Sequence, residues 1–157
     1  MTTEPSPLDV LDRLVTAVND HDLDRLVGCF ADDYRLTDPV HPARSFEGAA
    51  QVRRNWSTMF AAVPDIHLEV RDRAVTDTGF WLEATQAGTR HDGVALTTQT
   101  VFVAKVDGGR IRSAHMYAAP VEEGGPGIDA VFAAMAGHSP APSPVGEQSL
   151  RSAGEPS

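Results

Sequence analysis

The sequence predicts a single α+β domain in which three N-terminal helices pack on a curved, mixed or antiparallel sheet. Through the first third of the chain, apolar residues recur at the three- and four-residue spacing of amphipathic helices. From Ile66 onward the spacing changes to two, and glycine-containing turns separate the alternating segments, which is typical of an antiparallel meander. A chain of 157 residues is long enough to build one core around a pocket.

Three helices are expected, over residues 7–20, 22–33 and 47–62. In the first, Leu8, Leu11 and Leu14 mark one apolar face. Asp22 has the residue type and the position of an N-cap for the second helix. Pro64 follows the third helix and cannot continue it.

One short strand is expected at residues 34–37, because Asp38 and Pro39 follow it. Proline cannot donate to a strand ladder, and it forces the residue before it into an extended conformation. Four further strands are expected: from Ile66 to the turn at 77–79, and then over 80–87, 96–106 and 110–119.

Composition also suggests how the chain divides. We expect a polar tail at residues 1–6, the folded domain at 7–120, a linker with a short helix at 121–136, and a disordered tail at 137–157. Residues 122–127 combine two acids with four glycines or prolines, which breaks regular structure. The final segment is rich in Ser, Pro and Gly and poor in apolar residues, so it cannot bury enough surface to offset the entropy of folding.

Charge and cysteine content exclude several classes of function. The chain carries 22 acidic and 13 basic residues, a net charge of -9, which disfavours nucleic acid and membrane surfaces as partners. A single cysteine, Cys29, rules out an internal disulfide and a multi-cysteine metal site, and we expect neither a metal nor a cofactor. No apolar run approaches the ~20 residues that span a bilayer, and no leader is visible, so we expect a cytoplasmic protein.

Several motifs together resemble a known family. They are NDHDLDRLVGCFADDYRLTDP at residues 19–39, FEG before the third helix, VPD before the sheet, AGTRHDG between strands and DGGRI before the last strand. With these motifs the chain resembles the nuclear transport factor 2-like superfamily, which includes SnoaL-like polyketide cyclases, ketosteroid isomerase, scytalone dehydratase and limonene epoxide hydrolase. The resemblance covers about residues 8–120. It implies a cone-shaped α+β fold, a small apolar ligand, and a homodimer formed by the outer face of the sheet.

The resemblance assigns a role to Asp38. The stretch FADDYRLTDPV is similar to the segment of ketosteroid isomerase whose aspartate, just before the proline, is the general base. Burial in a half-apolar pocket would raise the pKa of such a carboxyl toward a useful value. The second interpretation of an Asp-Pro pair is a turn cap, in which the carboxylate accepts hydrogen bonds from backbone amides. Both interpretations stay open from the sequence.

Three further residues are candidates for proton transfer. His67 resembles in position a catalytic histidine of scytalone dehydratase, although its neighbours Glu69 and Arg71 on the same face are typical of a solvated or dimer-facing surface. His115 and Tyr117 share a face of the last strand, which lines the pocket in the family. They would supply hydrogen-bond donors for a carbonyl or enolate oxygen, or form a satisfied core pair.

Bulky side chains are the candidates for substrate contact. Aromatic residues provide large apolar walls, and a histidine in a loop can reach a pocket mouth. Because side chains alternate along a strand, Trp81 shares a face with Glu83, and Phe80 and Leu82 lie on the opposite face. The predicted substrate-binding residues are Trp56, Trp81, Phe60 and His41.

The first functional hypothesis is an enzyme that transfers protons without a cofactor. It would be an aldol-type cyclase, isomerase or dehydratase acting on an apolar carbonyl or polyketide-like compound, with Asp38 abstracting a proton. One alternative is a non-catalytic ligand-binding or assembly protein on the same fold. Another is an epoxide hydrolase, which needs two acids and an arginine around one water. Convergence of Asp38, His115 and Tyr117 on one cavity would favour catalysis.

Overall fold

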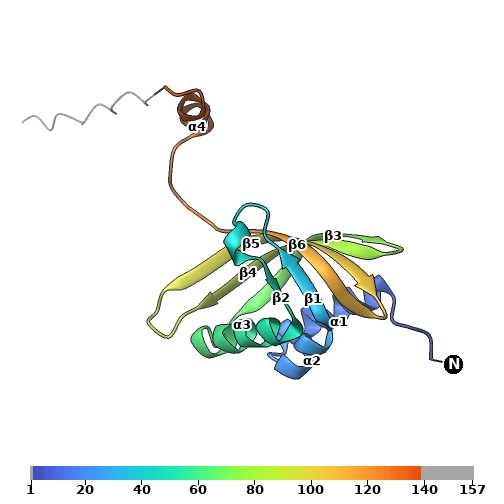
Figure 1. Ribbon diagram of the computed structural model, residues 1–157. Helices are drawn as coiled ribbons and strands as arrows, with labels where there is room; N and C mark the ends of the chain where they lie inside the picture. Colours follow the sequence, from blue (N-terminus) through green and yellow to red (C-terminus); the bar gives the residue numbers. More distant parts are fainter. Residues whose placement is uncertain (1, 139–157) are drawn as a thin grey trace, which may run out of the picture. The chain divides into compact units, whose positions relative to one another are not determined.

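The computed structural model describes residues 2–138 and divides after Val121 into two units. Most of the tail expected at residues 137–157 lies outside the described residues. The first unit contains three helices and a curved sheet, with the helices on one side of the sheet (Figure 1). The predicted α+β fold class is confirmed.

Helix α1 (Pro7–Asn19) begins where Ser6 and Asp9 form a capping box. The Ser6 hydroxyl accepts from the Asp9 amide, while the Asp9 carboxylate accepts from the Ser6 amide, so two otherwise unpaired donors are satisfied. The apolar face of α1 is buried through Val10, Leu11, Leu14, Ala17 and Val18. Ser6, expected in the N-terminal tail, therefore belongs to the helix cap.

Helix α2 (Leu23–Gly28) is capped by Asp22 as predicted, but it is shorter than predicted. Residues that were expected to continue the helix to Asp33 instead form strand β1 (Phe30–Thr37). They do so because β1 pairs in parallel with the last strand, which buries Phe30, Tyr34 and Leu36. Tertiary pairing has overridden local helical spacing.

A short turn carries the chain from β1 to the third helix. It contains a 3-10 turn (Pro42–Arg44) and strand β2 (Phe46–Glu47), which pairs antiparallel with β1. Helix α3 (Ala49–Ala62) begins two residues later than Glu47, which was predicted to lie in its first turn. Pairing of β2 with β1 sets the point from which α3 starts to cross the sheet (Figure 1).

The four remaining strands form the predicted meander. They are β3 (His67–Thr76), β4 (Gly79–Thr89), β5 (Ala95–Asp107) and β6 (Arg110–Pro120). The sheet order is β2-β1-β6-β5-β4-β3, with β1 and β6 parallel and all other neighbours antiparallel. The sheet is therefore mixed.

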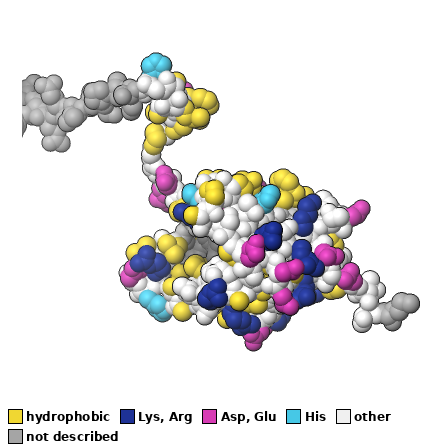
Figure 2. Space-filling model, viewed as in Figure 1, with side chains coloured by type: hydrophobic (Ala, Val, Ile, Leu, Met, Phe, Trp, Pro, Cys, Tyr) yellow, Lys and Arg dark blue, Asp and Glu magenta, His cyan; other side chains and the backbone are white. Residues whose placement is uncertain are grey.

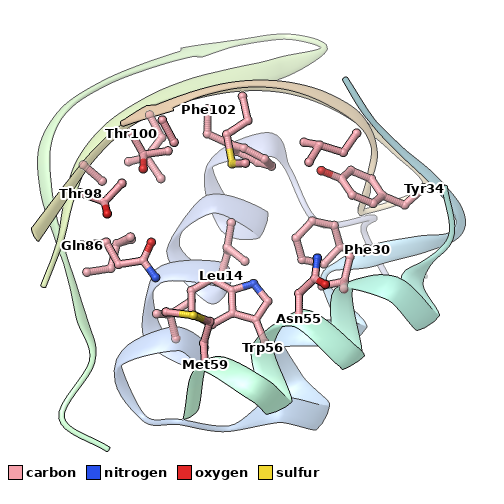
Figure 3. A pocket seen from close by; sticks show the side chains of 18 of the residues that line it. Leu14, Phe30, Tyr34, Asn55, Trp56, Met59, Gln86, Thr98, Thr100 and Phe102 are labelled. Carbon is pink, nitrogen blue, oxygen red and sulfur yellow. The ribbon is translucent and has the colours of Figure 1, made fainter. Parts of the chain in front are cut away.

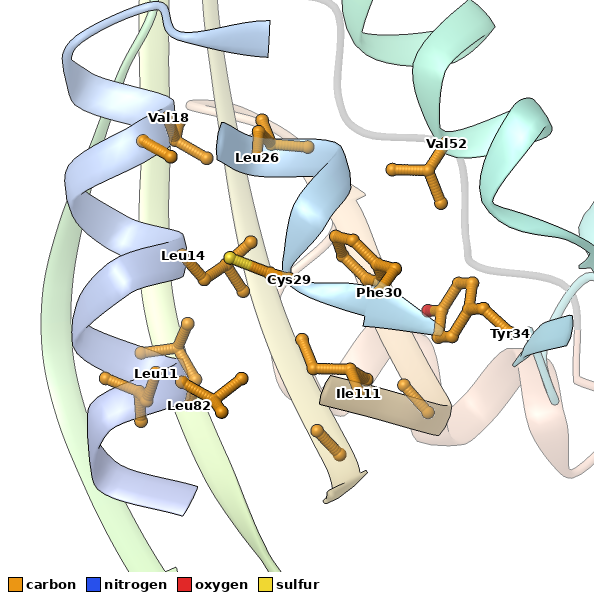
Figure 4. Close-up of a cluster of buried hydrophobic side chains, with 14 of the residues drawn as sticks. Leu11, Leu14, Val18, Leu26, Cys29, Phe30, Tyr34, Val52, Leu82 and Ile111 are labelled. Atoms are coloured by element: carbon orange, nitrogen blue, oxygen red, sulfur yellow. The ribbon is translucent and has the colours of Figure 1, made fainter. Parts of the chain in front are cut away.

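The core lies between the helices and the inner face of the sheet (Figure 4). Aromatic rings of Phe30 and Tyr34 meet edge to face with centroids 4.7 Å apart. Cys29 is fully buried, and burial raises the pKa of its thiol to about 11. It therefore acts as a small apolar core residue.

Charged side chains of both signs are interspersed on the visible surface (Figure 2). Arginines pair with acids from neighbouring elements, as in Arg53 with Asp24 at 2.8 Å and Arg112 with Asp33 at 2.8 Å. These pairs are exposed, so each contributes at most about 1 kcal/mol to stability.

The second unit contains helix α4 (Ile128–Met135). Its apolar side chains are exposed, including Ile128, Phe132 and Met135. None of the helices within residues 2–138 has the length and apolar character required to cross a bilayer.

Candidate ligand-binding site

A cavity of about 290 Å³ lies between the inner face of the sheet and helices α1 and α3 (Figure 3). Its size falls at the lower end of the range for small-molecule sites. The walls come from both helices and from strands β1 to β6. The lining residues are Leu14, Val18, Phe30, Tyr34, Leu36, Phe46, Val52, Asn55, Trp56, Met59, Leu68, Leu82, Ala84, Gln86, Thr98, Thr100, Phe102, Met116 and Ala118.

Strand register explains which sheet residues reach the cavity. Ala84, Thr100 and Ala118 are cross-strand neighbours on β4, β5 and β6, so their side chains leave the same face at one level. Gln86 is directly opposite Thr98 on the same face. Across β4, β5 and β6 the cavity wall is therefore apolar apart from a short polar stretch on β4 and β5.

Tyr34 places a phenol at the cavity wall. Its side chain is 2% exposed, and burial raises the pKa of the phenol well above its usual range. The hydroxyl consequently stays protonated at physiological pH and remains a hydrogen-bond donor.

Asp38 lies at the end of β1 and is 3% exposed, but it is not among the lining residues. One carboxylate oxygen, Oδ1, accepts from the Val40 amide at 3.1 Å and from the His41 amide at 2.8 Å. Its own amide donates to Ser45 Oγ at 3.0 Å. Asp38 is thus held in the turn, as the second sequence interpretation described.

The surroundings of Asp38 make it a weaker base. The hydrogen bond from the His41 amide is the largest cause that lowers the carboxyl pKa. The nearby His41 imidazole, the Val40 amide and the Arg44 guanidinium act in the same direction, against the effect of burial. A general base in an apolar pocket requires the opposite shift.

His115 and Tyr117 share a face, as expected, but it is the outer face of the sheet. A β-bulge at Arg112 causes this, because Val106 pairs with Ile111 while Lys105 pairs with Ser113. The extra residue reverses the alternation, so Ile111 is buried inward and the two polar residues point outward. Convergence of these two residues with Asp38 on one cavity, the arrangement that would favour catalysis, is not seen.

The other predicted residues are scattered. Trp56 lines the cavity, whereas Phe60 packs beside it with ring centroids 5.5 Å apart and is not itself a lining residue. Trp81 is 56% exposed on the outer face, and His67 is exposed at the start of β3. His41 is half-buried in the loop, with Nδ1 3.5 Å from Asp38 Oδ2.

Five lining polar residues were not predicted as site residues, namely Tyr34, Asn55, Gln86, Thr98 and Thr100. For the four that lie on strands, the alternation of side chains offered a signal; Gln86, for example, follows Leu82 by four positions. Tyr34 precedes Leu36 by two positions, and Thr98 and Thr100 precede Phe102 by four and two. Within residues 2–138, no cluster of three or more His, Cys, Asp or Glu side chains is arranged to hold a metal ion.

Comparison with known proteins identifies the family. The model of the SnoaL-like domain matches residues 11–114, which is more than half of the chain. The chain belongs to the SnoaL-like domain family. No curated protein matches it.

Several solved structures have the same fold as this chain. IdmH, a candidate polyketide cyclase from Streptomyces antibioticus, has a TM-score of 0.61 at 21% identity, over 71% of this chain and 91% of that chain. An epoxide hydrolase of M. tuberculosis has a TM-score of 0.60 at 16% identity, over 70% and 80%. A protein of ketosteroid isomerase-like fold from Catenulispora acidiphila has a TM-score of 0.59 at 16% identity, over 69% of this chain and 83% of that chain. These similarities show that the SnoaL-like chain has the nuclear transport factor 2-like fold.

The lowered pKa of Asp38 predicts a specific dependence of stability on pH. Ionised Asp38 contributes its full stabilisation above the ordinary aspartate pKa of about 3.9, and this is lost as the pH falls through the lower folded-state value. Asp38→Asn keeps an oxygen for the turn amides but cannot ionise. Its free energy of unfolding, measured with urea, should therefore fall less than that of the wild type between about pH 5 and pH 2.

A matched control is Asp77→Asn, in the exposed turn between β3 and β4. This variant should keep the pH dependence of the wild type. An Asp38→Asn profile parallel to that of the wild type would show that the turn bonds do not depend on the charge.

Proposed function

We propose that this SnoaL-like domain binds a small, uncharged and mostly apolar molecule in its cavity. The observation that carries the proposal is the chemistry of the lining. Among the described residues that line it there is no Asp, Glu, His, Lys or Arg. A charged ligand would lose its hydration there without gaining a counter-charge, at a cost of several kcal/mol or more.

The polar part of the lining suggests a ligand that carries oxygen. The Tyr34 hydroxyl can donate to a carbonyl or hydroxyl oxygen, while the apolar walls bury a ring or chain. IdmH, which has the same fold, is a candidate polyketide cyclase. We therefore favour an apolar carbonyl or polyketide-like compound as the ligand.

Proton-transfer catalysis is the second candidate, and one observation favours it. Asp38 is buried two residues beyond Leu36, which lines the cavity, and the Tyr34 phenol could stabilise an enolate oxygen formed there. A cyclase, isomerase or dehydratase of this kind would require the Asp38 carboxylate to leave the Val40 and His41 amides. Epoxide hydrolysis has less support, because no described lining residue supplies the acid pair and the arginine.

Filling the cavity tests the binding proposal. Ala118 lines the cavity, and the next residue, Ala119, is exposed. Ala118→Phe should lower the affinity for para-phenylphenol by at least about tenfold, because its ring occupies ligand space. Ala119→Phe is the control and should change the affinity by less than about twofold. Isothermal titration calorimetry measures both, and equal affinities in the two variants would place binding elsewhere.

We also propose that the outer face of the sheet pairs with a second copy of the chain. Trp81 and Tyr117 are exposed there, and their cross-strand neighbours Val103 and Val101 are half-buried beside them. Trp81 is 56% exposed and Tyr117 is 43% exposed, and exposed aromatic residues of this kind are enriched at interfaces.

Sedimentation velocity tests this pairing. The wild type should sediment with twice the monomer mass, and Trp81→Glu should dissociate it, because a buried unpaired carboxylate is costly. Val40→Glu changes an exposed apolar residue in the loop after β1 and should leave the dimer intact. A monomeric wild type at micromolar concentration would contradict the pairing.

A further inference from the structure

Polar groups line the cavity at two separate ends. At one end is the hydroxyl of Tyr34 on β1, and the exposed side chain of Asn55 on α3 lines the cavity on the same side (Figure 3). At the other end are Gln86 on β4 and Thr98 and Thr100 on β5, which together form the β4–β5 polar cluster. Apolar side chains, including Leu14 and Phe102, lie between the two ends.

Strand register shows how far apart these ends are. Leu36 pairs with Ala114 of β6, and Tyr34 lies two residues before Leu36. Thr100 pairs with Ala118, four residues further along β6. At about 3.3 Å per residue, the backbones of Tyr34 and Thr100 are roughly 20 Å apart along the strand direction. Even with both side chains reaching inward, one ligand oxygen cannot contact both ends.

Both ends are available to a ligand. Among the described residues, none donates a hydrogen bond to, or accepts one from, the Tyr34 hydroxyl or the side chains of Gln86, Thr98 and Thr100. Within residues 2–138, every fully buried polar side-chain atom has a hydrogen-bond partner. The unpaired polar atoms of these four residues are therefore not fully buried, and they border open cavity space. Polar groups at the cavity wall would otherwise have to be satisfied by water.

We propose that the ligand is an elongated, uncharged molecule with an apolar body and a hydrogen-bonding oxygen at each end. This inference rests on the binding function proposed above and adds the requirement for two anchors. The Tyr34 hydroxyl donates to an oxygen at one end. The β4–β5 polar cluster offers both donors and acceptors, so it takes a hydroxyl or a carbonyl at the other end.

A matched set of rigid probes tests the two anchors. Biphenyl has no polar end, para-phenylphenol has one hydroxyl, and para,para-biphenol has a hydroxyl at each end. Two variants each remove one anchor with little change in volume. They are Tyr34→Phe and the cluster variant, Gln86→Met with Thr98→Val and Thr100→Val. Thr97→Val, an exposed position next to the cluster, is the control.

Calorimetric affinities should show two independent contributions. Each anchor variant should lower the affinity for the biphenol by about three- to tenfold. The combined variant should lower it by approximately the product of the two factors. The affinity for biphenyl should be the same in every variant. The monohydroxyl probe can reverse its orientation, so it should lose affinity clearly only in the combined variant. Thr97→Val should match the wild type, and thermal unfolding verifies that every variant is folded.

Two other outcomes have distinct meanings. Suppose that biphenyl and para-phenylphenol bind, but that one anchor variant lowers the affinity for the biphenol no more than the affinity for biphenyl. The two-anchor inference is then overturned, and the binding function stands. If none of the three probes binds to the wild type, the proposed binding function is overturned together with the inference.

Discussion

The hydrogen bonds from the amides of Val40 and His41 to the Asp38 carboxylate hold the turn on which the rest of the first unit depends. This turn brings β2 back against β1, and the pairing of Glu47 with Arg35 fixes the point where α3 starts. Helix α3 then forms one wall of the cavity with Trp56 and Met59. A carboxylate committed to this turn has a lowered pKa, so the same bonds that shape the cavity reduce the capacity of Asp38 to act as a base.

A one-residue bulge in β6 determines which of its side chains face the cavity and which face outward. Because β6 is bulged at Arg112, Met116 and Ala118 face the cavity, and His115 and Tyr117 face outward. The inner face keeps neutral groups around a ligand-sized space. The outer face gains the polar and aromatic side chains that would otherwise have entered the site, which is consistent with a second copy binding there.

Periodicity predicted most of the architecture, because helices and strands bury every third or fourth, or every second, residue. It predicted the α1 face, the Asp22 cap, the meander and the opposite orientations of Trp81 and Leu82. The inner and outer faces of β6 could not be predicted, since a bulge is set by pairing with β5 rather than by local sequence. The strand at Phe30 was likewise missed, because its parallel partner lies about eighty residues away. The sequence predicted Tyr34 only as part of a short strand, although its two-residue spacing from Leu36 indicates that both side chains lie on the same face.

We propose that the cavity binds a neutral ligand and that Asp38 stabilises the turn and does not abstract a proton. The most direct measurement is deuterium exchange beside the carbonyl of α-tetralone, followed by NMR in heavy water at concentrations where calorimetry shows binding. Our account predicts that the wild type and Asp38→Asn both leave the exchange rate at its value in buffer. Acceleration by the wild type that Asp38→Asn abolishes would contradict the account and establish Asp38 as a general base.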